Sequence, residues 1–569
     1  MAMQPGKMVG QVRRRRVIRI MAVRQGEQIV MAKHKRLVTG GRVFTADVDN
    51  LWAQAVVIDG NRIEYVGDAE TAAAIAGEHA QHIDVNGGVV VPGFVDGHVH
   101  ITLTGASMLK AYLRDSGNIE EIQRRVKAWA DKNPDAPRVL GTDWEHADVP
   151  NNRPTKEMLD VIVPDRPVYL EAFDFHSCWV NSAALAELGI DDNTPDPAGG
   201  TIVRDPETGE ATGHLLESAS FNLVAPLLSR VPDDVRDGYV TTAFDAYARA
   251  GITTVVEMAL EEDALESIAR IQAAGKLTTR VVAHMIIWRK GNTEEELALV
   301  ARAAELAKVY QGDLLRVGGI KIIGDGSIDA CTAALSQPYT NGSSSDPIWD
   351  PQALEPVVAA ADAAGLQIAV HAVGDQAIRY TVDAMEKAMQ VNSTSGKRHR
   401  IEHLEYAQRE DIERMGKLGI TASMQPVHLD PTYLQNWMAM LGPERSNHGF
   451  AWPLHVAAGS VLAFGTDAPT TPHLSLPNMY IASTRKSPSN DQLPAHRPDW
   501  ALPLEAAITH GTRDSAWAAW LDHVTGVLQP GLAADLVVLD RDFFVQGPAS
   551  LLETNVQLTM MDGVIVYST

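Results

Sequence analysis

Residues 92–100 read PGFVDGHVH, a short apolar run that ends in two histidines. Seven further β-branched or apolar runs follow it, several of them separated by Ala-rich helical stretches such as 264–275 and 353–365. Strands that are buried on both faces and alternate with helices are typical of a parallel barrel. The sequence therefore predicts an α/β fold with a (β/α)8 TIM barrel, and a doubly wound open sheet is the alternative. The eight predicted strands lie within 92–100, 251–260, 278–287, 315–327, 365–375, 398–407, 419–426 and 459–469.

Two further regions surround the predicted barrel domain of residues 93–519. Short β-like runs with Gly and Asn-Gly turn signals fill residues 37–92, and similar runs return in residues 520–569. We expect both chain ends to pair into one small β-sandwich domain. The segment of about 103–250 is too long for a single βα connection, so we expect it to form an inserted subdomain over the barrel mouth.

The first 36 residues differ from the rest of the chain in charge. They contain ten Lys or Arg and a single acidic residue, Glu27, whereas the whole 569-residue chain has a net charge of −23. Charged residues interrupt the stretch after the arginines, which disfavours a twin-arginine export signal. We expect residues 1–36 to form a basic, disordered extension, or translation to start near Met31.

The composition excludes several classes of protein. Hydrophobic residues make up 45% and charged residues 21% of the chain, which are ordinary globular values. The acidic net charge disfavours binding to nucleic acid or to anionic membranes, and no run approaches the ~18 apolar residues of a membrane helix. With only two cysteines, Cys178 and Cys331, a disulfide framework is excluded and a cytoplasmic location is expected. A homo-oligomer is compatible with these features.

Histidines and an aspartate stand at the C-terminal ends of the predicted strands. His98 and His100 end the first strand, and their spacing of two directs both imidazoles to the same side. His371, His403 and Asp467 end the fifth, sixth and eighth strands. An isolated His-x-His is more often structural, but barrel enzymes place their active sites at these strand ends. Imidazole and carboxylate ligands suit a divalent cation such as zinc, so the pattern predicts a metal centre.

Lys321, in the fourth predicted strand, has two interpretations. It can be an ordinary strand-end lysine that reaches solvent. It can also point into the barrel, where a lowered pKa leaves its amine neutral enough to react with carbon dioxide. The carbamate formed in that way would bridge two metal ions.

These motifs, together with GLAADLVVLD at 531–540, resemble in order and spacing the amidohydrolase superfamily. Within it, the chain is similar to amidohydrolase family 3, the branch that contains N-substituted formamide deformylases. The resemblance runs from about Leu37 to Thr569 and implies a TIM barrel with a small β-sandwich. It also implies two zinc ions, the first on His98, His100 and Asp467, the second on His371 and His403, with a carboxylated Lys321 between them.

The chemistry that such ligands imply is hydrolysis. Two close divalent cations lower the pKa of a bridging water, and hydroxide then attacks a carbonyl carbon while Asp467 acts as the general acid/base. We expect cleavage of a C–N bond in a small-molecule amide, N-formyl amine or cyclic amide. One alternative is a deaminase of an aminated heterocycle, which the presence of Lys321 disfavours. Another is a noncatalytic assembly protein, which the complete set of six ligands disfavours.

Four residues are candidate substrate contacts, and a structural role is the alternative for each. Three of them lie in the inserted segment, whose tryptophans hint at an apolar substrate. The fourth follows the lysine strand and can orient either substrate or a ligating histidine, although an aspartate beside a glycine also forms turns. The four residues are Trp144, His176, Trp179 and Asp325.

Overall fold

The computed structural model describes residues 35–172, 177–197, 200–217, 219–228 and 230–569. The predicted basic extension lies almost entirely outside the described residues, and so does the candidate substrate contact His176.

Eight parallel strands form the centre of the molecule, hydrogen-bonded to one another in chain order. At the closing edge, the backbone N–H of Asp467 donates to the carbonyl of His98 over 2.7 Å. The predicted strands and the (β/α)8 architecture are therefore confirmed, and the open-sheet alternative is not. The strands are β8 (Phe94–Val99), β15 (Ile252–Leu260), β16 (Arg280–Ile286), β17 (Leu315–Ile323), β18 (Gln367–Ala372), β19 (Arg400–His403), β20 (Thr421–Met424) and β21 (Leu462–Phe464).

Helices surround this barrel and bury both faces of its strands; every residue of β16 is buried. Helix α10 (Pro351–Ala363) shows how the sequence sets their limits. Asp350 caps its first turn by accepting the N–H of Ala353, Pro351 occupies the first helical position, and Gly365 follows its end with a φ of 78°. The other main barrel helices are α7 (Asp233–Arg249), α8 (Glu262–Ala273), α9 (Thr293–Val309), α11 (Asp375–Asn392), α12 (Arg409–Leu418), α15 (Trp452–Ala458), α17 (Leu504–His510) and α18 (Arg513–Ala518).

Two small sheets form the predicted β-sandwich. The first contains β1 (Arg36–Thr39), β4 (Ala55–Asp59), β5 (Arg62–Gly67) and β6 (Gln81–Asp84). The second contains β2 (Arg42–Phe44), β3 (Trp52–Ala53), β7 (Val89–Pro92), β22 (Leu536–Leu539), β23 (Val556–Met561) and β24 (Val564–Ser568).

Both chain ends meet in the second sheet, because β22 pairs antiparallel with β7 and places Val537 opposite Val91. Apolar side chains of the two sheets form one buried core between them. The sandwich is joined to the barrel by the buried Arg280 of β16, which pairs with Asp535 over 2.8 Å and with Asp562 over 2.9 Å.

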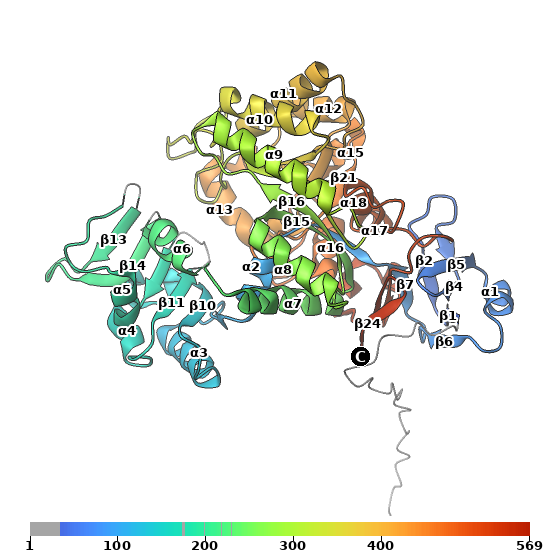
Figure 1. Ribbon diagram of the computed structural model, residues 1–569, viewed down its shortest axis with the longest axis horizontal. Coiled ribbons are helices and arrows are strands. Elements are labelled where there is room, and N and C mark those ends of the chain that lie inside the picture. The colour runs from blue at the N-terminus through green and yellow to red at the C-terminus, as the bar shows by residue number, and fades with distance from the viewer. Residues whose placement is uncertain (1–34, 173–176, 198–199, 218, 229) are drawn as a thin grey trace, which may run out of the picture.

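The inserted segment forms a subdomain with a sheet of its own. It follows α2 (Ile101–Met108) and precedes α7. These two helices pack closely because Gly105 has no side chain; a Cβ there would lie 1.8 Å from the Tyr239 carbonyl oxygen. In Figure 1 it lies on the opposite side of the barrel from the small sandwich. Its main elements are β9 (Ala111–Tyr112), α3 (Ile119–Lys132), β10 (Val139–Trp144), α4 (Lys156–Asp160), β11 (Val168–Ala172), β12 (Ser177–Val180), α5 (Ser182–Leu188), β13 (Gly200–Arg204) and β14 (Ala211–Glu217).

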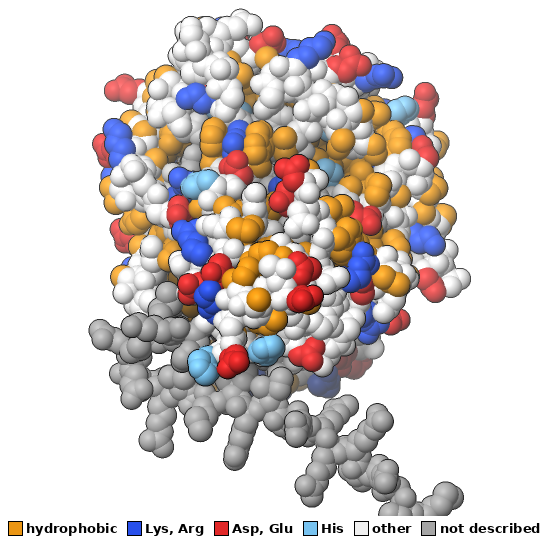
Figure 2. All heavy atoms as spheres, turned by 90° about the vertical axis from the view of Figure 1, so that its right-hand side faces the viewer, with side chains coloured by type: hydrophobic (Ala, Val, Ile, Leu, Met, Phe, Trp, Pro, Cys, Tyr) orange, Lys and Arg blue, Asp and Glu red, His pale blue; other side chains and the backbone are white. Residues whose placement is uncertain are grey.

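The surface on the sandwich side carries charges of both signs, interspersed with apolar side chains (Figure 2). Among the described residues, no helix has both the length and the apolar character that a membrane-spanning helix needs.

Candidate metal centre

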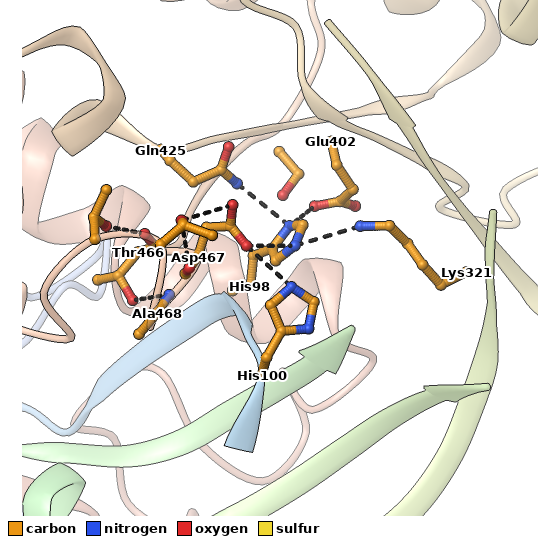
Figure 3. Close-up of polar contacts among 12 residues, drawn as sticks. His98, His100, Lys321, Glu402, Gln425, Thr466, Asp467 and Ala468 are labelled. Carbon is orange, nitrogen blue, oxygen red and sulfur yellow. Dashed lines mark hydrogen bonds and ion pairs between the residues drawn. The ribbon is translucent and has the colours of Figure 1, made fainter. Parts of the chain in front are cut away.

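His98 and His100 direct their side chains to the same carboxylate at the C-terminal end of the barrel (Figure 3). The Nε2 atoms of His98 and His100 lie 3.3 and 3.1 Å from Oδ1 of Asp467. The two histidines are on β8 and the residue that follows it, whereas Asp467 follows β21, so the site forms where the first and last barrel strands meet.

A buried carboxylate fixes the ring of His98. Nδ1 of His98 lies 2.7 Å from Oε2 of Glu402, and Arg400 donates from Nε to the other oxygen over 2.5 Å. Arg400 also donates to the carbonyl of Gly97 and to the hydroxyl of Ser423, both over 2.6 Å. Burial favours the neutral form of Glu402, but the charge of Arg400 outweighs it and holds the pKa well below its usual range. Because Glu402 occupies Nδ1, Nε2 is the nitrogen that faces the site.

The charges in the centre favour a neutral His98 and an ionised Asp467. Burial, aided by the charge of Lys321, lowers the pKa of His98 to about 3, so its imidazole is in the form that ligates metals. Burial would raise the pKa of Asp467, but the imidazoles of His98, His100 and His403 hold it well below its usual range. Asp467 is therefore a carboxylate across the pH range of a folded protein.

Lys321 lies inside the barrel and not in solvent, with only 1% of its surface exposed. Its Nζ lies 3.3 Å from Nε2 of His98 (Figure 3). Burial is the main reason that its pKa falls to about 8, since the interior penalises the ammonium form. The amine is thus much closer to neutrality at physiological pH than an ordinary lysine is.

His371 and His403 form the other side of the centre. Their ring centroids are 4.4 Å apart, and the ring of His403 is 5.0 Å from that of His98. Nε2 of His371 donates to the carbonyl of Gly326 over 3.1 Å. His403 has a φ of 75° and Asp467 a φ of 59°, values that are uncommon for non-glycine residues and that concentrate at functional sites.

Two further residues of the site, Glu405 and His428, are not identified by the sequence motifs. Glu405 follows β19, and His428 lies in the short helix η4 (Pro426–Leu429) after β20. Nδ1 of His428 lies 3.0 Å from Oε1 of Glu405, and Nε2 lies 3.6 Å from Oδ2 of Asp467. Burial lowers the pKa of His428, but these two carboxylates outweigh it and the net pKa is raised. The position of His428 directly after the seventh strand was the available sequence signal.

The residues of the centre fit a divalent cation. His98, His403 and Asp467 are buried and offer one ligand atom each, all within 4.8 Å of one another. Within the part of the chain that the structure describes, Nδ1 of His403 is buried without a hydrogen-bond partner. Neutral imidazoles beside a carboxylate are the donor set that zinc and related ions prefer.

Comparison with known proteins agrees with this geometry. A profile of the amidohydrolase family matches residues 81–567. The chain belongs to the amidohydrolase family. The putative amidohydrolase YtcJ of Bacillus subtilis is 30% identical over 93% of this chain and 98% of its own length. The N-substituted formamide deformylase of Arthrobacter pascens is 27% identical over the same shares.

Solved structures support the same assignment. An uncharacterized metal-dependent hydrolase from Pyrococcus horikoshii superimposes with a TM-score of 0.75 at 25% identity, over 90% of this chain and 98% of that structure. The resemblance predicted from the motifs is therefore confirmed, and the protein is a hydrolase of the metal-dependent amidohydrolase type.

A cavity of about 790 Å³ in this amidohydrolase lies between the insertion and the barrel mouth. Its barrel side includes Ala468 and Pro469, directly after Asp467, so the cavity leads toward the metal centre. On the side of the inserted segment, the residues that line the cavity include Tyr112, Arg114, Asp143 and Glu145.

The predicted tryptophan contacts lie elsewhere, in the packed interior of the insertion. Neither Trp144 nor Trp179 has exposed surface. The indole of Trp144 donates to the carbonyl of Leu170, and that of Trp179 to the carbonyl of Thr155, each over 2.9 Å. In this conformation both tryptophans stabilise the subdomain rather than line the cavity.

Asp325 supports the loop that follows His371 at the end of β18. It is buried and accepts backbone N–H groups from Ala334, Val373 and Gly374 over 2.8–3.0 Å. Burial raises its pKa to about 7. Its Oδ1 lies 3.5 Å from Nε2 of His371, which fits the predicted role of orienting a ligating histidine better than contact with substrate.

Proposed function

We propose that this amidohydrolase cleaves a C–N bond in a small-molecule amide, N-formyl amine or cyclic amide. The observation that carries the proposal is the convergence of five imidazole or carboxylate groups and one buried lysine at a single barrel mouth. The relative from Arthrobacter pascens, whose name records action on N-substituted formamides, supports this class of substrate.

The proposed cofactor is a pair of zinc ions. His98, His100 and Asp467 would hold one ion, and His371 and His403 the other. Lys321, carboxylated on Nζ, would lie between them, which its burial and its lowered pKa support. When bound, such cations lower the pKa of water and polarise a carbonyl group.

Asp467 is the proposed general acid/base. The water oxygen bonds to the carbonyl carbon of the substrate, and Asp467, an ionised carboxylate, accepts the proton that the water loses. When the C–N bond breaks, Asp467 returns this proton to the leaving nitrogen, and the products are a carboxylic acid and an amine. The cavity beside Asp467 is large enough for a small organic molecule.

A substrate screen with the zinc-loaded full chain tests the proposal. The panel contains N-formyl amines, carboxamides, hydantoins, lactams and aminated heterocycles, and the assays measure released acid, amine and ammonia separately. We expect close to two zinc ions per chain and release of an acid together with an amine. Ammonia released from aminated rings alone would identify a deaminase, and active protein without metal would refute the metal-dependent mechanism.

A pair of histidine variants controls the metal measurement. His403→Ala removes a buried group of the centre, whereas His523→Ala removes an imidazole whose side chain is 62% exposed, far along the sequence from every proposed ligand. We expect zinc to be lost only in His403→Ala. Equal zinc content in both variants would refute the proposed ligand set.

A further inference from the structure

The cavity between the insertion and the barrel mouth is lined by charges of unequal number. Among the described residues that line it, there are four carboxylates and one guanidinium. A single cation cannot neutralise four anions, so the lining side chains give the cavity an excess of negative charge. The cavity leads toward Asp467, and this charge therefore acts on the molecule that reaches the proposed reaction. The charged lining residues are Asp115, Asp143, Glu145, Asp430 and Arg114.

The guanidinium of Arg114 is shared by two carboxylates of the insertion. Its Nη1 lies 3.6 Å from Oδ1 of Asp143, and its Nε lies 3.9 Å from Oε1 of Glu145. Both distances are longer than a hydrogen bond. Nη2 of Arg114 donates to the hydroxyl of Tyr433 over 3.1 Å, so part of the guanidinium faces the barrel side instead. The wall formed by the insertion consequently keeps a net negative charge.

On the barrel side, the buried carboxylate of Asp430 has no cationic partner. Asp430 precedes helix α13 (Pro431–Leu441) and is only 6% exposed, and its Oδ1 caps the helix by accepting the N–H of Thr432 over 3.0 Å. Within the described parts of the chain, no group donates to Oδ2 and no basic side chain lies at ion-pair distance. A buried charge is costly unless it is paired. Since Asp430 lines the cavity, a molecule bound there can supply the partner.

Two tyrosines line the same cavity. Tyr112 is 58% exposed on the side of the insertion, and Tyr433 belongs to α13 on the side of the barrel. The faces of aromatic rings attract organic cations, and they do so in addition to any nearby carboxylate. An anionic molecule would meet repulsion from four carboxylates instead. The lining thus favours a cation over an anion, and a cation over a neutral molecule of the same shape.

We infer that the substrate carries an alkylammonium group on the part that extends into the cavity, and that Asp143 and Asp430 are the specificity-determining residues that bind it. This inference deepens the proposed amide hydrolysis and rests on it. The amide group would lie beside Asp467, and the cationic group would lie between the insertion and α13. An uncharged amide of the same size would leave the carboxylates without a partner and would bind more weakly.

Two small probes of the same shape test the charge preference without any turnover. Choline contains a quaternary ammonium group, which has no lone pair for zinc, and dimethylbutanol is its uncharged carbon isostere. By calorimetry on the zinc-loaded full chain at low ionic strength, we expect choline to bind at least about tenfold more tightly than dimethylbutanol. Added salt should reduce this difference, because it screens the attraction between the charges.

Two asparagine variants assign the preference to particular residues. Asparagine tolerates the φ of 65° at Asp143 and caps a helix as well as aspartate does at position 430, so both variants should keep the fold. We expect Asp143→Asn and Asp430→Asn each to weaken choline binding at least about threefold, and the double variant to lose most of the preference. Dimethylbutanol affinity and zinc content should not change. Asp131→Asn is the matched control, because its side chain is 62% exposed on α3.

Turnover of two formamides supplies the second readout. N-formylputrescine carries an ammonium group where N-formylpentylamine has a methyl group, and we expect kcat/KM to be at least about tenfold higher for the cation. In the asparagine variants this ratio should fall mainly through KM.

Equal affinity of the parent for choline and dimethylbutanol, or no binding of either probe, would overturn the inference. A preference that persists in the double variant, or that Asp131→Asn reduces equally, would overturn it as well. If the parent hydrolyses no amide, the proposed function fails, while the binding of the two probes still decides whether the cavity selects a cation.

Discussion

The two halves of the metal centre are held in place in different ways. In the first half, His98 and His100 come from one strand end, and buried carboxylates face their Nδ1 atoms: Glu402 at 2.7 Å and Glu257 at 3.8 Å. In the second half, His371 and His403 come from neighbouring strands. The hydrogen bond of His371 goes to a backbone carbonyl, with Asp325 at 3.5 Å from the same nitrogen, and Nδ1 of His403 has no hydrogen-bond partner among the described residues.

Carboxylates close to the ring nitrogens orient the histidines of the first half, whereas a backbone carbonyl and ring packing contribute more to the orientation of those in the second half. A carboxylate on the outer nitrogen of a histidine fixes its orientation and makes it a stronger metal ligand. We therefore expect the first half to bind a cation more tightly, and the second half to depend on Lys321 and on the loop that Asp325 holds. The following predictions test that contrast.

The largest effect is expected for Asp467→Asn, which alters the residue that both histidines of the first half approach. The substitution keeps size and hydrogen bonding but removes the proton acceptor, so kcat should fall at least about 100-fold while the fold and at least one metal ion remain. Turnover and bound zinc are measured on the same preparation. Near-normal turnover at normal zinc content would end the assignment of Asp467 as general base.

Lys321→Ala should reduce metal binding in the second half more than in the first. Without the lysine, we expect zinc to fall from close to two ions toward one per chain, because the first half keeps its own carboxylates. Small carboxylic acids such as formate or propionate should partly restore metal and activity by occupying the vacated space. Lys276→Ala, at an exposed position, is the control. Full activity without Lys321 would show that this residue is not part of the machinery.

Glu402→Gln should weaken the first half selectively. Loss of a carboxylate partner of a ligating histidine lowers metal affinity by about 10- to 100-fold. Competition with a chromogenic chelator measures this affinity, and Glu410→Gln, whose side chain is 74% exposed, is the control. Glu257→Gln should have a smaller effect, since Glu257 is 3.8 Å from His100. If both buried variants retain parental affinity, the contrast between the halves is wrong.

The smallest expected effect is the pH dependence of Lys321 carboxylation in metal-free protein. A lysine pKa near 8 lies below the ordinary value of 10.5, so the reactive neutral amine becomes more abundant as pH rises through 8. At constant dissolved carbon dioxide, the fraction of Lys321 in the neutral amine form should grow about eight- to tenfold between pH 7 and pH 9. Labelled carbon dioxide and carbon-13 NMR detect the carbamate, with Lys321→Arg as control. A signal that does not change with pH, or that persists in the control, contradicts the prediction.

The barrel strands were predictable because their signal is local. Most are short apolar or β-branched runs, and the proposed metal ligands lie near or just beyond the C-terminal ends of these strands, as His98 and His403 do. The orienting carboxylates were not predictable in that way. Glu402 is 304 residues from His98, and only the closed barrel brings them together.

In the inserted segment, by contrast, the roles of the aromatic residues could not be predicted from the sequence. Large aromatic residues such as Trp144 and Trp179 can line a binding cavity, yet the same side chains also fill cores. One sequence contains no local signal that separates the two uses, and the structure gives both indoles the second one. The sheet of this subdomain likewise mixes parallel and antiparallel pairs, without the regular alternation of strand and helix that revealed the barrel.

The pairing of β22 with β7 has a consequence for synthesis of the protein. Strand β7 ends at Pro92, but its partner spans residues 536–539, so the ribosome makes nearly the whole barrel before this neighbour exists. Until then one edge of β7 is open to other chains, and the buried Arg280 lacks Asp535. The open edge of β7 therefore persists until late in translation, and the final strands cover it only after all the barrel strands have been made.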